Sequence, residues 1–322
     1  MESSFAATNA RRITNMTGFY ANDWIERGLV DTFTAAGTNA HRVFSSRNAW
    51  IERFDTDYLV SYKDSADLTE LTSDLQGWIA FCELPVSRVF GRYLAIQNNE
   101  RNAPVLVSGD AAIPLETVVT ENHLRYGIDF AAGYSVGLFF DQRANREFLI
   151  GVRPKRVLNT FAYTCSFSVV AASVGAQSVS IDLSAKSLSR GKANFALNDF
   201  SCDGHRFLAD DALEVMPRLV RKMELFDAII LDPPTFSRGA KGRKFQVEKN
   251  LGDLLHLAIE LAAPQARILV STNCTRLDLE ALETLARGEL RIGQRRAEFH
   301  RTLPLPDFPP GEGAATLWLL LD

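Results

Sequence analysis

The strongest constraint on the fold is a regular alternation of short apolar runs and helical segments that begins at Arg156. Parallel strands buried on both faces read as continuous apolar runs, and a crossover helix joins each strand to the next. The pattern therefore predicts an α/β domain built on a mostly parallel sheet. We expect strands at 157–159, 178–181, 205–208, 227–231, 267–271, 296–302 and 314–321, and helices at 166–174, 185–197, 212–223 and 250–262.

The sequence before this region has a different pattern, with short apolar runs separated by turn residues. A length of 322 residues suits two domains. We expect an N-terminal helical arm over 1–40 and a small mixed α+β domain over 41–122, which is a candidate for substrate or RNA binding. The alternating domain would then occupy 123–322. At its start we expect a hairpin that pairs 124–130 with 136–140, and then a helix that follows Asp141 and ends near Gly151.

Composition narrows the class of protein. No apolar run reaches the 18 to 20 or so residues that a membrane span needs, and the first residues show no secretory signal. The net charge of −4 argues against a protein that coats nucleic acid with its whole surface. Cys82, Cys165, Cys202 and Cys274 are scattered without a metal or disulfide spacing, so reduced thiols and a cytoplasmic location are expected.

The apolar run that ends at Leu231 is followed by Asp232, Pro233, Pro234, Thr235 and Phe236. Proline cannot donate to a sheet ladder, so the prolines end the strand and leave Asp232 at its carboxyl end, where open α/β sheets bind ligands. Asp-Pro-Pro followed by an aromatic residue is typical of enzymes that methylate bases. The acid can hold a base edge and the aromatic ring offers a stacking face. The alternative interpretation is an ordinary turn after a strand.

Acidic residues also follow the second and third predicted strands of this domain. Asp182 suits the ribose of S-adenosylmethionine, because a carboxylate can accept from two vicinal hydroxyls, and Asp210 suits the adenine amino group. A lone acid at a strand end is most often a turn or cap residue, but a series that ends with Asp232 favours a shared pocket. The segment after the first strand lacks GxGxxG, which disfavours a nicotinamide oxidoreductase.

Four ordered segments carry a resemblance to a known family: 138–143, 157–164, 180–184 and 231–237. Together they resemble the class I S-adenosylmethionine-dependent methyltransferases that modify bacterial large-subunit rRNA, whose members make 5-methylcytosine or 7-methylguanine. The resemblance covers about 124–322. It implies a Rossmann-like sheet, mostly parallel with an antiparallel last strand, S-adenosyl-L-methionine as cofactor and rRNA as partner. The family usually has glycine after the Tyr-Thr pair, where this chain has Cys165 and Ser166.

The resemblance also implies one pocket for cofactor and base, and no metal. The residues expected to line or support the cofactor are Gln142, Arg143, Asn159, Phe161, Tyr163, Thr164, Asp182, Leu183, Asp210, Asp211 and Asp232. The residues expected at the reacting base are Asp232, Pro233, Pro234, Phe236 and Cys274.

Cys274 follows the fifth predicted strand and leaves two chemistries open. Carbon 5 of cytosine is a poor nucleophile until a thiolate adds to carbon 6, and Cys274 with Asp232 would supply such a pair. Nitrogen 7 of guanine already carries a lone pair and needs no cysteine. The 231–237 segment resembles the guanine branch more closely, and the other interpretation of Cys274 is a small buried residue at a strand end.

A basic cluster lies directly after Phe236, and we interpret it as a candidate RNA contact because it adjoins the proposed site. Its predicted RNA-binding members are Arg238, Lys241, Arg243 and Lys244. Two alternatives to an RNA base methyltransferase remain at this point: an enzyme of the same fold acting on a small molecule or protein, and a non-catalytic RNA-binding homologue. The family resemblance is also compatible with a homodimer.

Overall fold

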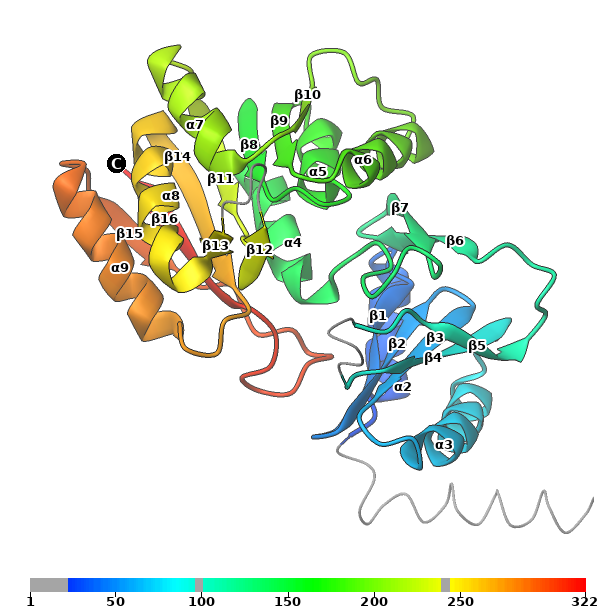
Figure 1. Cartoon of the computed structure of the whole chain (residues 1–322). Coiled ribbons are helices and arrows are strands. Elements are labelled where there is room, and N and C mark those ends of the chain that lie inside the picture. The colour runs from blue at the N-terminus through cyan, green and yellow to red at the C-terminus, as the bar shows by residue number, and fades with distance from the viewer. Residues whose placement is uncertain (1–22, 96–100, 239–243) are drawn as a thin grey trace, which may run out of the picture. The chain divides into compact units, whose positions relative to one another are not determined.

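The computed structural model describes residues 23–95, 101–238 and 244–322 (Figure 1). Contacts divide them into two compact units. The first runs to Phe140 and includes Pro306–Pro309, and the second covers Asp141–Leu305 and Pro310–Asp322. Contacts thus place 123–140 in the first unit, although the sequence analysis placed them in the second domain. The functions assigned to the sequence domains stay predictions.

The first unit contains a five-stranded sheet in the order β1-β2-β3-β4-β5 and a separate hairpin of β6 and β7. Neighbouring strands are antiparallel except β3 and β4, which α3 connects as a crossover. Trp24 stacks on Trp78 of α3 with 5.4 Å between ring centroids. The elements are α2 (Arg27–Ala35), β1 (Ala40–Ser45), β2 (Ala49–Phe54), β3 (Asp57–Tyr62), α3 (Asp67–Cys82), β4 (Arg88–Tyr93), β5 (Val105–Gly109), β6 (Glu116–Glu121) and β7 (Leu124–Asp129).

The predicted partner of β7 was wrong. β7 pairs with β6 and not with 136–140, which forms no strand. The connecting residues Asn122 and His123 have φ values of 50° and 65°, as a tight two-residue hairpin turn requires. This short turn closes the hairpin with the preceding segment, so β7 has no need of the longer Ala-Ala-Gly-Tyr loop that follows it.

The second unit is built on a seven-stranded sheet in the order β10-β9-β8-β11-β14-β16-β15. The five strands from β10 to β14 are parallel, and β16, the last strand in the chain, is antiparallel to both of its neighbours. The predicted fold class is therefore confirmed. The strands are β8 (Arg156–Thr160), β9 (Gln177–Asp182), β10 (Arg206–Ala209), β11 (Phe226–Leu231), β14 (Ala262–Thr272), β15 (Ala297–His300) and β16 (Ala315–Leu321), with a small hairpin of β12 (Phe236–Arg238) and β13 (Lys244–Gln246).

Helices cover both faces of this sheet (Figure 1). The set α4, α5 and α6 packs in series on one face, and the set α7, α8 and α9 packs on the other. Helix α8 shows why, since its buried Leu251, Leu254, Leu255 and Ala258 form one apolar stripe at helical spacing. The helices are α4 (Arg143–Val152), preceded by the short η1 (Phe140–Gln142), α5 (Ser166–Ser173), α6 (Ala185–Leu197), α7 (Ala212–Arg221), α8 (Val247–Leu261) and α9 (Leu279–Ile292).

The strands and helices expected from Arg156 onward are present, with ends shifted by a few residues. Helix α9 and the β12–β13 hairpin were not predicted from the sequence. Helix α9 carries ordinary signals, since Asp278 caps its first turn and Leu282, Ala286 and Leu290 are buried at helical spacing. Within the described ranges, no helix combines the length and the apolar character that crossing a membrane requires.

The strand order reverses between β8 and β11, which fixes where a ligand crevice opens. Thr160 at the end of β8 pairs with Leu231 at the end of β11. The loops that leave these two strands run to opposite sides of the sheet, and open α/β sheets bind ligands at such a switch point. Phe161 and Asp232, the next residue on each strand, therefore begin the candidate site.

Candidate functional site

Asp232 lies at the centre of the carboxyl edge of the sheet. Leu231 pairs with Val270 of β14, so Asp232 and Ser271 follow side by side on neighbouring strands. Removal from water raises the pKa of Asp232 to about 6, and the negative charge of Asp141 acts in the same direction. A hydrogen bond with Ser271 and the positive charge of Arg146 act in the opposite direction. The residue keeps part of its surface exposed to solvent.

The residues after Asp232 form a short, stiff segment that leads into the β12–β13 hairpin. Pro233 is buried, whereas Pro234 is exposed and Phe236 keeps 48% of its surface in solvent. Two successive prolines restrict the backbone between the acid and the aromatic residue. The motif predicts that the ring and the carboxylate together hold a flat, polar base, and this role stays a prediction.

The loop after β8 has an unusual backbone. Phe161, Tyr163 and Cys165 have positive φ values of 54°, 48° and 60°, a region that non-glycine residues adopt at some cost. The backbone N–H of Tyr163 donates to Oδ2 of Asp182 at 2.8 Å. This bond holds the loop after β8 against the end of β9 and compensates part of the strain.

The structure shows how Cys165 is accommodated at the position where the resembling family usually has glycine. Its side chain is fully buried and packs with Ala162 and Leu188. A Cβ added to Gly191 of α6 would lie 2.4 Å from Cys165 Sγ, so the glycine on α6 provides the space that the cysteine fills. Burial raises the pKa of the Cys165 thiol to about 12, so it stays protonated. The side chain of Cys165 therefore occupies the space that Gly191 leaves beneath α6.

A narrow pocket opens where the loops after β8, β9 and β10 meet the β12–β13 hairpin. Both oxygens of Asp182 accept backbone hydrogen bonds, Oδ2 from Tyr163 and Oδ1 from Ser184, at 2.8 Å each. Asp210 accepts from the backbone N–H of Asp211 and from Arg218. The lining residues are Phe161, Ile181, Asp182, Leu183, Asp210, Asp211, Ala212, Ser237 and Phe245.

This donor and acceptor set fits the adenosine part of S-adenosylmethionine. A carboxylate oxygen keeps a second lone pair after accepting one backbone bond, so Asp182 can still accept from ribose hydroxyls. Leu183 is 39% exposed at the pocket, and the rings of Phe161 and Phe245 lie 5.4 Å apart, which supplies apolar walls for a flat base. Asp210 offers the acceptor that an adenine amino group needs.

Four other predicted site residues are outside the lining of this pocket and are buried or hydrogen-bonded within the second unit. Asn159 is buried and donates to Ser168, whose hydroxyl contacts that of Ser180. The backbone carbonyl of Thr164 accepts from Asn194. Gln142 donates to Ser271 at 2.7 Å, and Arg143 is buried at the start of α4. These side chains fix the strand ends and loops that shape the site.

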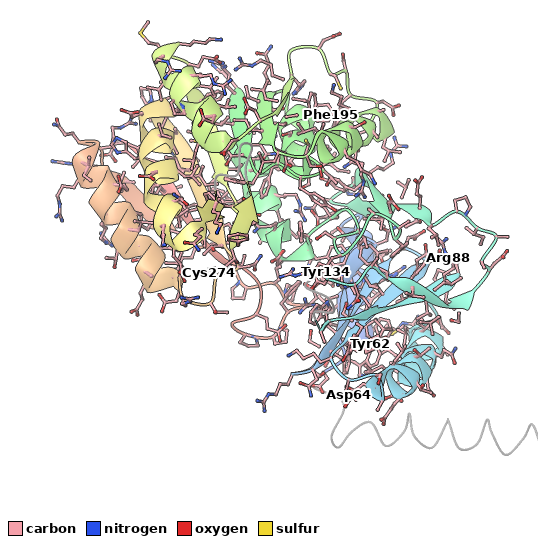
Figure 2. All side chains as sticks on the ribbon, in the orientation of Figure 1. Tyr62, Asp64, Arg88, Tyr134, Phe195 and Cys274 are labelled. Carbon is pink, nitrogen blue, oxygen red and sulfur yellow. The ribbon has the colours of Figure 1, made fainter. Side chains whose placement is uncertain are left out.

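Cys274 lies in the loop after β14, beside the first turn of α8 (Figure 2). It is 7% exposed and belongs to the apolar core between the sheet and the helices α7, α8 and α9. Its thiol donates to Oε1 of Glu248 at 3.5 Å, and the same carboxylate pairs with Arg276 at 2.9 Å. Cys274 is therefore held by packing and by a carboxylate partner.

The predicted RNA-contact residues are only partly covered by the structure. Lys244 begins β13 and is exposed, two residues before Gln246, which pairs with Phe236. Lys241 and Arg243 lie outside the described residues, and so does the side chain of Arg238. Their role stays a prediction.

Sequence reasoning missed several residues at the site. Phe245 and Ser237 reach the pocket from the β12–β13 hairpin, which was expected to be a loop. Ser271 and Asn145 contact Gln142, which directly precedes α4 and lies at the end of β14. The three-residue spacing of Gln142 and Asn145 at the start of a helix was the available signal, because such residues lie on one face.

The sequence comparisons agree with this geometry. Residues 67–321 match the S-adenosylmethionine-dependent methyltransferase family. The ribosomal RNA large subunit methyltransferase K/L of Shewanella sp. (strain MR-4) is 36% identical over 183 residues, which are 55% of this chain and 25% of that protein. YwbD of Bacillus subtilis (strain 168), provisionally named as a ribosomal RNA large subunit methyltransferase, is 31% identical over 193 residues, 59% of this chain and 48% of that one. The chain thus spans about a quarter to a half of the curated relatives it matches.

The structural comparison gives the same fold. The crystal structure of SMU.776, a protein provisionally named as a methyltransferase and complexed with SAH, aligns with a TM-score of 0.74 at 22% identity. The alignment covers 92% of this chain and 78% of that one. With the family match spanning well over half of the sequence, the chain belongs to the S-adenosylmethionine-dependent methyltransferase family.

Proposed function

We propose that this protein transfers a methyl group from S-adenosylmethionine to a base of RNA, with ribosomal RNA as the substrate. The observation that carries the proposal is the arrangement around Asp232, a carboxyl group at the switch point of the sheet followed by two prolines and an exposed aromatic ring. The names of the relatives support rRNA as the substrate class.

The cofactor would be held at the rim of β9 and β10. Bound S-adenosylmethionine supplies an electrophilic methyl group on a sulfonium. Asp182 would accept from the ribose hydroxyls, Asp210 would accept from the adenine amino group, and Leu183 would cover the adenine face. The base would be held by Asp232, which accepts from an N–H on the base edge, and by the ring of Phe236, which offers a stacking surface.

The surroundings of Cys274 favour a ring nitrogen, such as nitrogen 7 of guanine, over carbon 5 of cytosine as the acceptor. A thiolate nucleophile needs a histidine or cationic neighbour and access to the base, and a carboxylate is a weak base for a thiol. Cys274 is buried in the apolar core and donates to Glu248, whose carboxylate is engaged by Arg276. This arrangement supports a packing role for the cysteine.

RNA contact by the segment after Phe236 belongs to the same proposal. Lys244 is exposed on β13, which pairs with the strand that begins at Phe236. Cations beside the base site would hold phosphates and set the register of the RNA. The small first unit is a second candidate for RNA contact. A cytoplasmic location and a homodimer remain predictions.

Methyl transfer from labelled cofactor to rRNA lacking its native modifications, followed by nucleoside mass analysis, tests the function. We expect label in a methylguanosine for the wild type and for Cys274→Ser, and loss of label in Asp232→Ala. Cys202→Ser is the matched control, since Cys202 is a partly exposed cysteine in the loop before β10. Label in 5-methylcytidine that disappears in Cys274→Ser and persists in Cys202→Ser would overturn the packing role, and the absence of label in any RNA would overturn the function.

A further inference from the structure

A chain of buried hydrogen bonds runs from the last strand of the sheet to Ser271, the neighbour of Asp232 on the paired strand. Trp318 on β16 donates through Nε1 to Oδ1 of Asn145 at 2.9 Å. Asn145 donates through Nδ2 to Oε1 of Gln142 at 2.8 Å, and Gln142 donates through Nε2 to Oγ of Ser271 at 2.7 Å. The side chains of these four residues are at most 2% exposed.

The direction of this chain follows from the chemistry of its first member. An indole N–H can only donate, so the oxygen of Asn145 must face Trp318 and its amino group must face Gln142. The same reasoning turns the oxygen of Gln142 toward Asn145 and its amino group toward Ser271. The Ser271 oxygen is then an acceptor from Gln142, and its own proton is left for Asp232, its neighbour at the ends of two paired strands.

We propose that Trp318, Asn145 and Gln142 are positioning residues for methyl transfer, which hold the Ser271 hydroxyl as a permanent donor to Asp232. This inference rests on the function proposed above. A serine hydroxyl can rotate and act as donor or acceptor. Here the indole N–H of Trp318 fixes the orientation of the Ser271 hydroxyl through the two amide side chains between them. Asp232 is thereby kept as an acceptor for a base that presents an N–H.

The polarity of the chain also restricts proton movement. Each member donates toward Asp232, and the chain ends at an indole nitrogen that has no lone pair to accept a proton. A proton taken up by Asp232 therefore cannot leave through these residues and must return to solvent or to the substrate side. The chain stabilises the charged carboxylate and does not relay protons.

Aromatic packing holds Trp318, the first donor of the hydrogen-bond chain, in place. Trp318 is fully buried, and its ring lies 4.7 Å from that of Phe148 on α4, which also stacks on His300 of β15. Trp318 thus contacts the same helix that carries Asn145 and that Gln142 directly precedes. Thr302 also donates to Oδ1 of Asn145, but at 3.4 Å, which makes it a weaker contact and a suitable control.

The test measures the pKa of Asp232 directly by carbon NMR. The protein is labelled at the aspartate side-chain carboxyl carbon, and the Asp232 signal is identified because it is lost in Asp232→Asn. The charged groups that act on Asp232 are Asp141 and Arg146, and both are unchanged in the variants. We expect the pKa of Asp232 to rise by about one unit in Ser271→Ala and by about half a unit in Trp318→Phe, because hydrogen bonds to the charged form are lost or weakened. Thr302→Val should titrate as the wild type does.

Methyl transfer gives the second readout. In Trp318→Phe the acid limb of the kcat/KM profile should move to higher pH by the same amount while the affinity for SAH is retained. If the aromatic exchange prevents folding, Asn145→Leu interrupts the chain one bond nearer to Asp232 and takes its place. A wild-type titration of Asp232 in these variants, beside a shifted one in Ser271→Ala, would overturn the proposal, because the chain would then end at Ser271.

The NMR titration needs neither RNA nor turnover. A wild-type protein that transfers no methyl group would refute the proposed function and leave the titration to decide whether the chain orients Ser271. An equal shift in Thr302→Val and Trp318→Phe would overturn the inference as well, since the effect would then come from general loosening around Asn145 and not from the directed chain.

Discussion

The substitution Asp232→Asn should stabilise the protein at neutral pH while it removes methyl transfer. The pKa of this carboxyl rises from 3.8 in an ordinary setting to about 6 in the folded protein, mainly because burial disfavours the charged form. A difference of about two pKa units corresponds to about 3 kcal/mol, at about 1.4 kcal/mol per unit. Because the residue keeps some contact with solvent, we expect about 2 to 3 kcal/mol.

The sign and the pH window follow from the raised pKa. Below about pH 4 the carboxyl is protonated in both folded and unfolded chains, so ionisation of Asp232 costs the folded state almost nothing. As the pH rises toward 6 the unfolded chain ionises first, and the folded state loses relative stability until its own carboxyl ionises. Asparagine does not ionise, so the advantage of Asp232→Asn is complete at pH 7.5 and falls below about 1 kcal/mol at pH 4.

Guanidinium unfolding of wild type and Asp232→Asn at pH 7.5 and pH 4 measures this difference. Asp253→Asn is the matched control, because Asp253 is exposed on α8 and its exchange should change the free energy of unfolding by less than about 0.5 kcal/mol. An Asp232→Asn protein that is no more stable than wild type at pH 7.5 would refute the reasoning. So would a gain of equal size at both pH values, since ionisation would then not be its cause.

Three further predictions concern other parts of the chain. Gly191→Ala should destabilise the fold by about 1 to 3 kcal/mol because the new methyl overlaps the Cys165 thiol, and Cys165→Gly in the same protein should restore stability in denaturant unfolding. Arg88→Ala should cost about 3 to 5 kcal/mol, since it leaves the carboxylate of Asp57, only 2% exposed, without the guanidinium that pairs with it at 2.6 Å; thermal unfolding would show the loss, and an unchanged midpoint would contradict it. Asp182→Ala should weaken SAH binding at least about tenfold by calorimetry, because an acceptor for the ribose hydroxyls is removed, and unchanged affinity would place the cofactor elsewhere.

Much of the second unit could be predicted from sequence because its signals are local. Buried parallel strands need continuous apolar runs, and the run from Ala228 to Leu231 shows such a strand whichever neighbours it has. The acids at strand ends could be predicted for the same reason, since carboxyl ends of parallel strands share one edge. Asp182 and Asp210 do line one pocket.

The hairpin before this unit shows where local signals fail. Both the Asn122-His123 turn and the later Ala-Ala-Gly-Tyr segment read as turns, and a strand between them can pair in either direction along the chain. Only the backbone of the turn decides, and the positive φ values at Asn122 and His123 select pairing with β6. The sequence pattern predicts both turns but does not show which of them closes the hairpin.

The identity of a residue, in turn, does not give its role. By sequence alone Cys274 suited a nucleophile as well as a packing residue, because a thiol at a strand end fits both. Tertiary structure places Glu248 and the apolar core around it, which favours packing. Cys165 likewise departed from a glycine position, and only the contact with Gly191 of α6 shows where its side chain fits.

By itself, the sequence determined the alternating fold, the order of the strands along the chain and the acids at the carboxyl edge, because each depends on residues that are close in sequence. Tertiary structure alone decided which distant side chains meet. The bonds from Trp318 through Asn145 and Gln142 to Ser271 join β16, the start of α4 and β14, and the bonded residues lie up to 173 positions apart in the chain. Such contacts depend on the angles and distances at which helices pack on a sheet, and a one-dimensional pattern does not encode them.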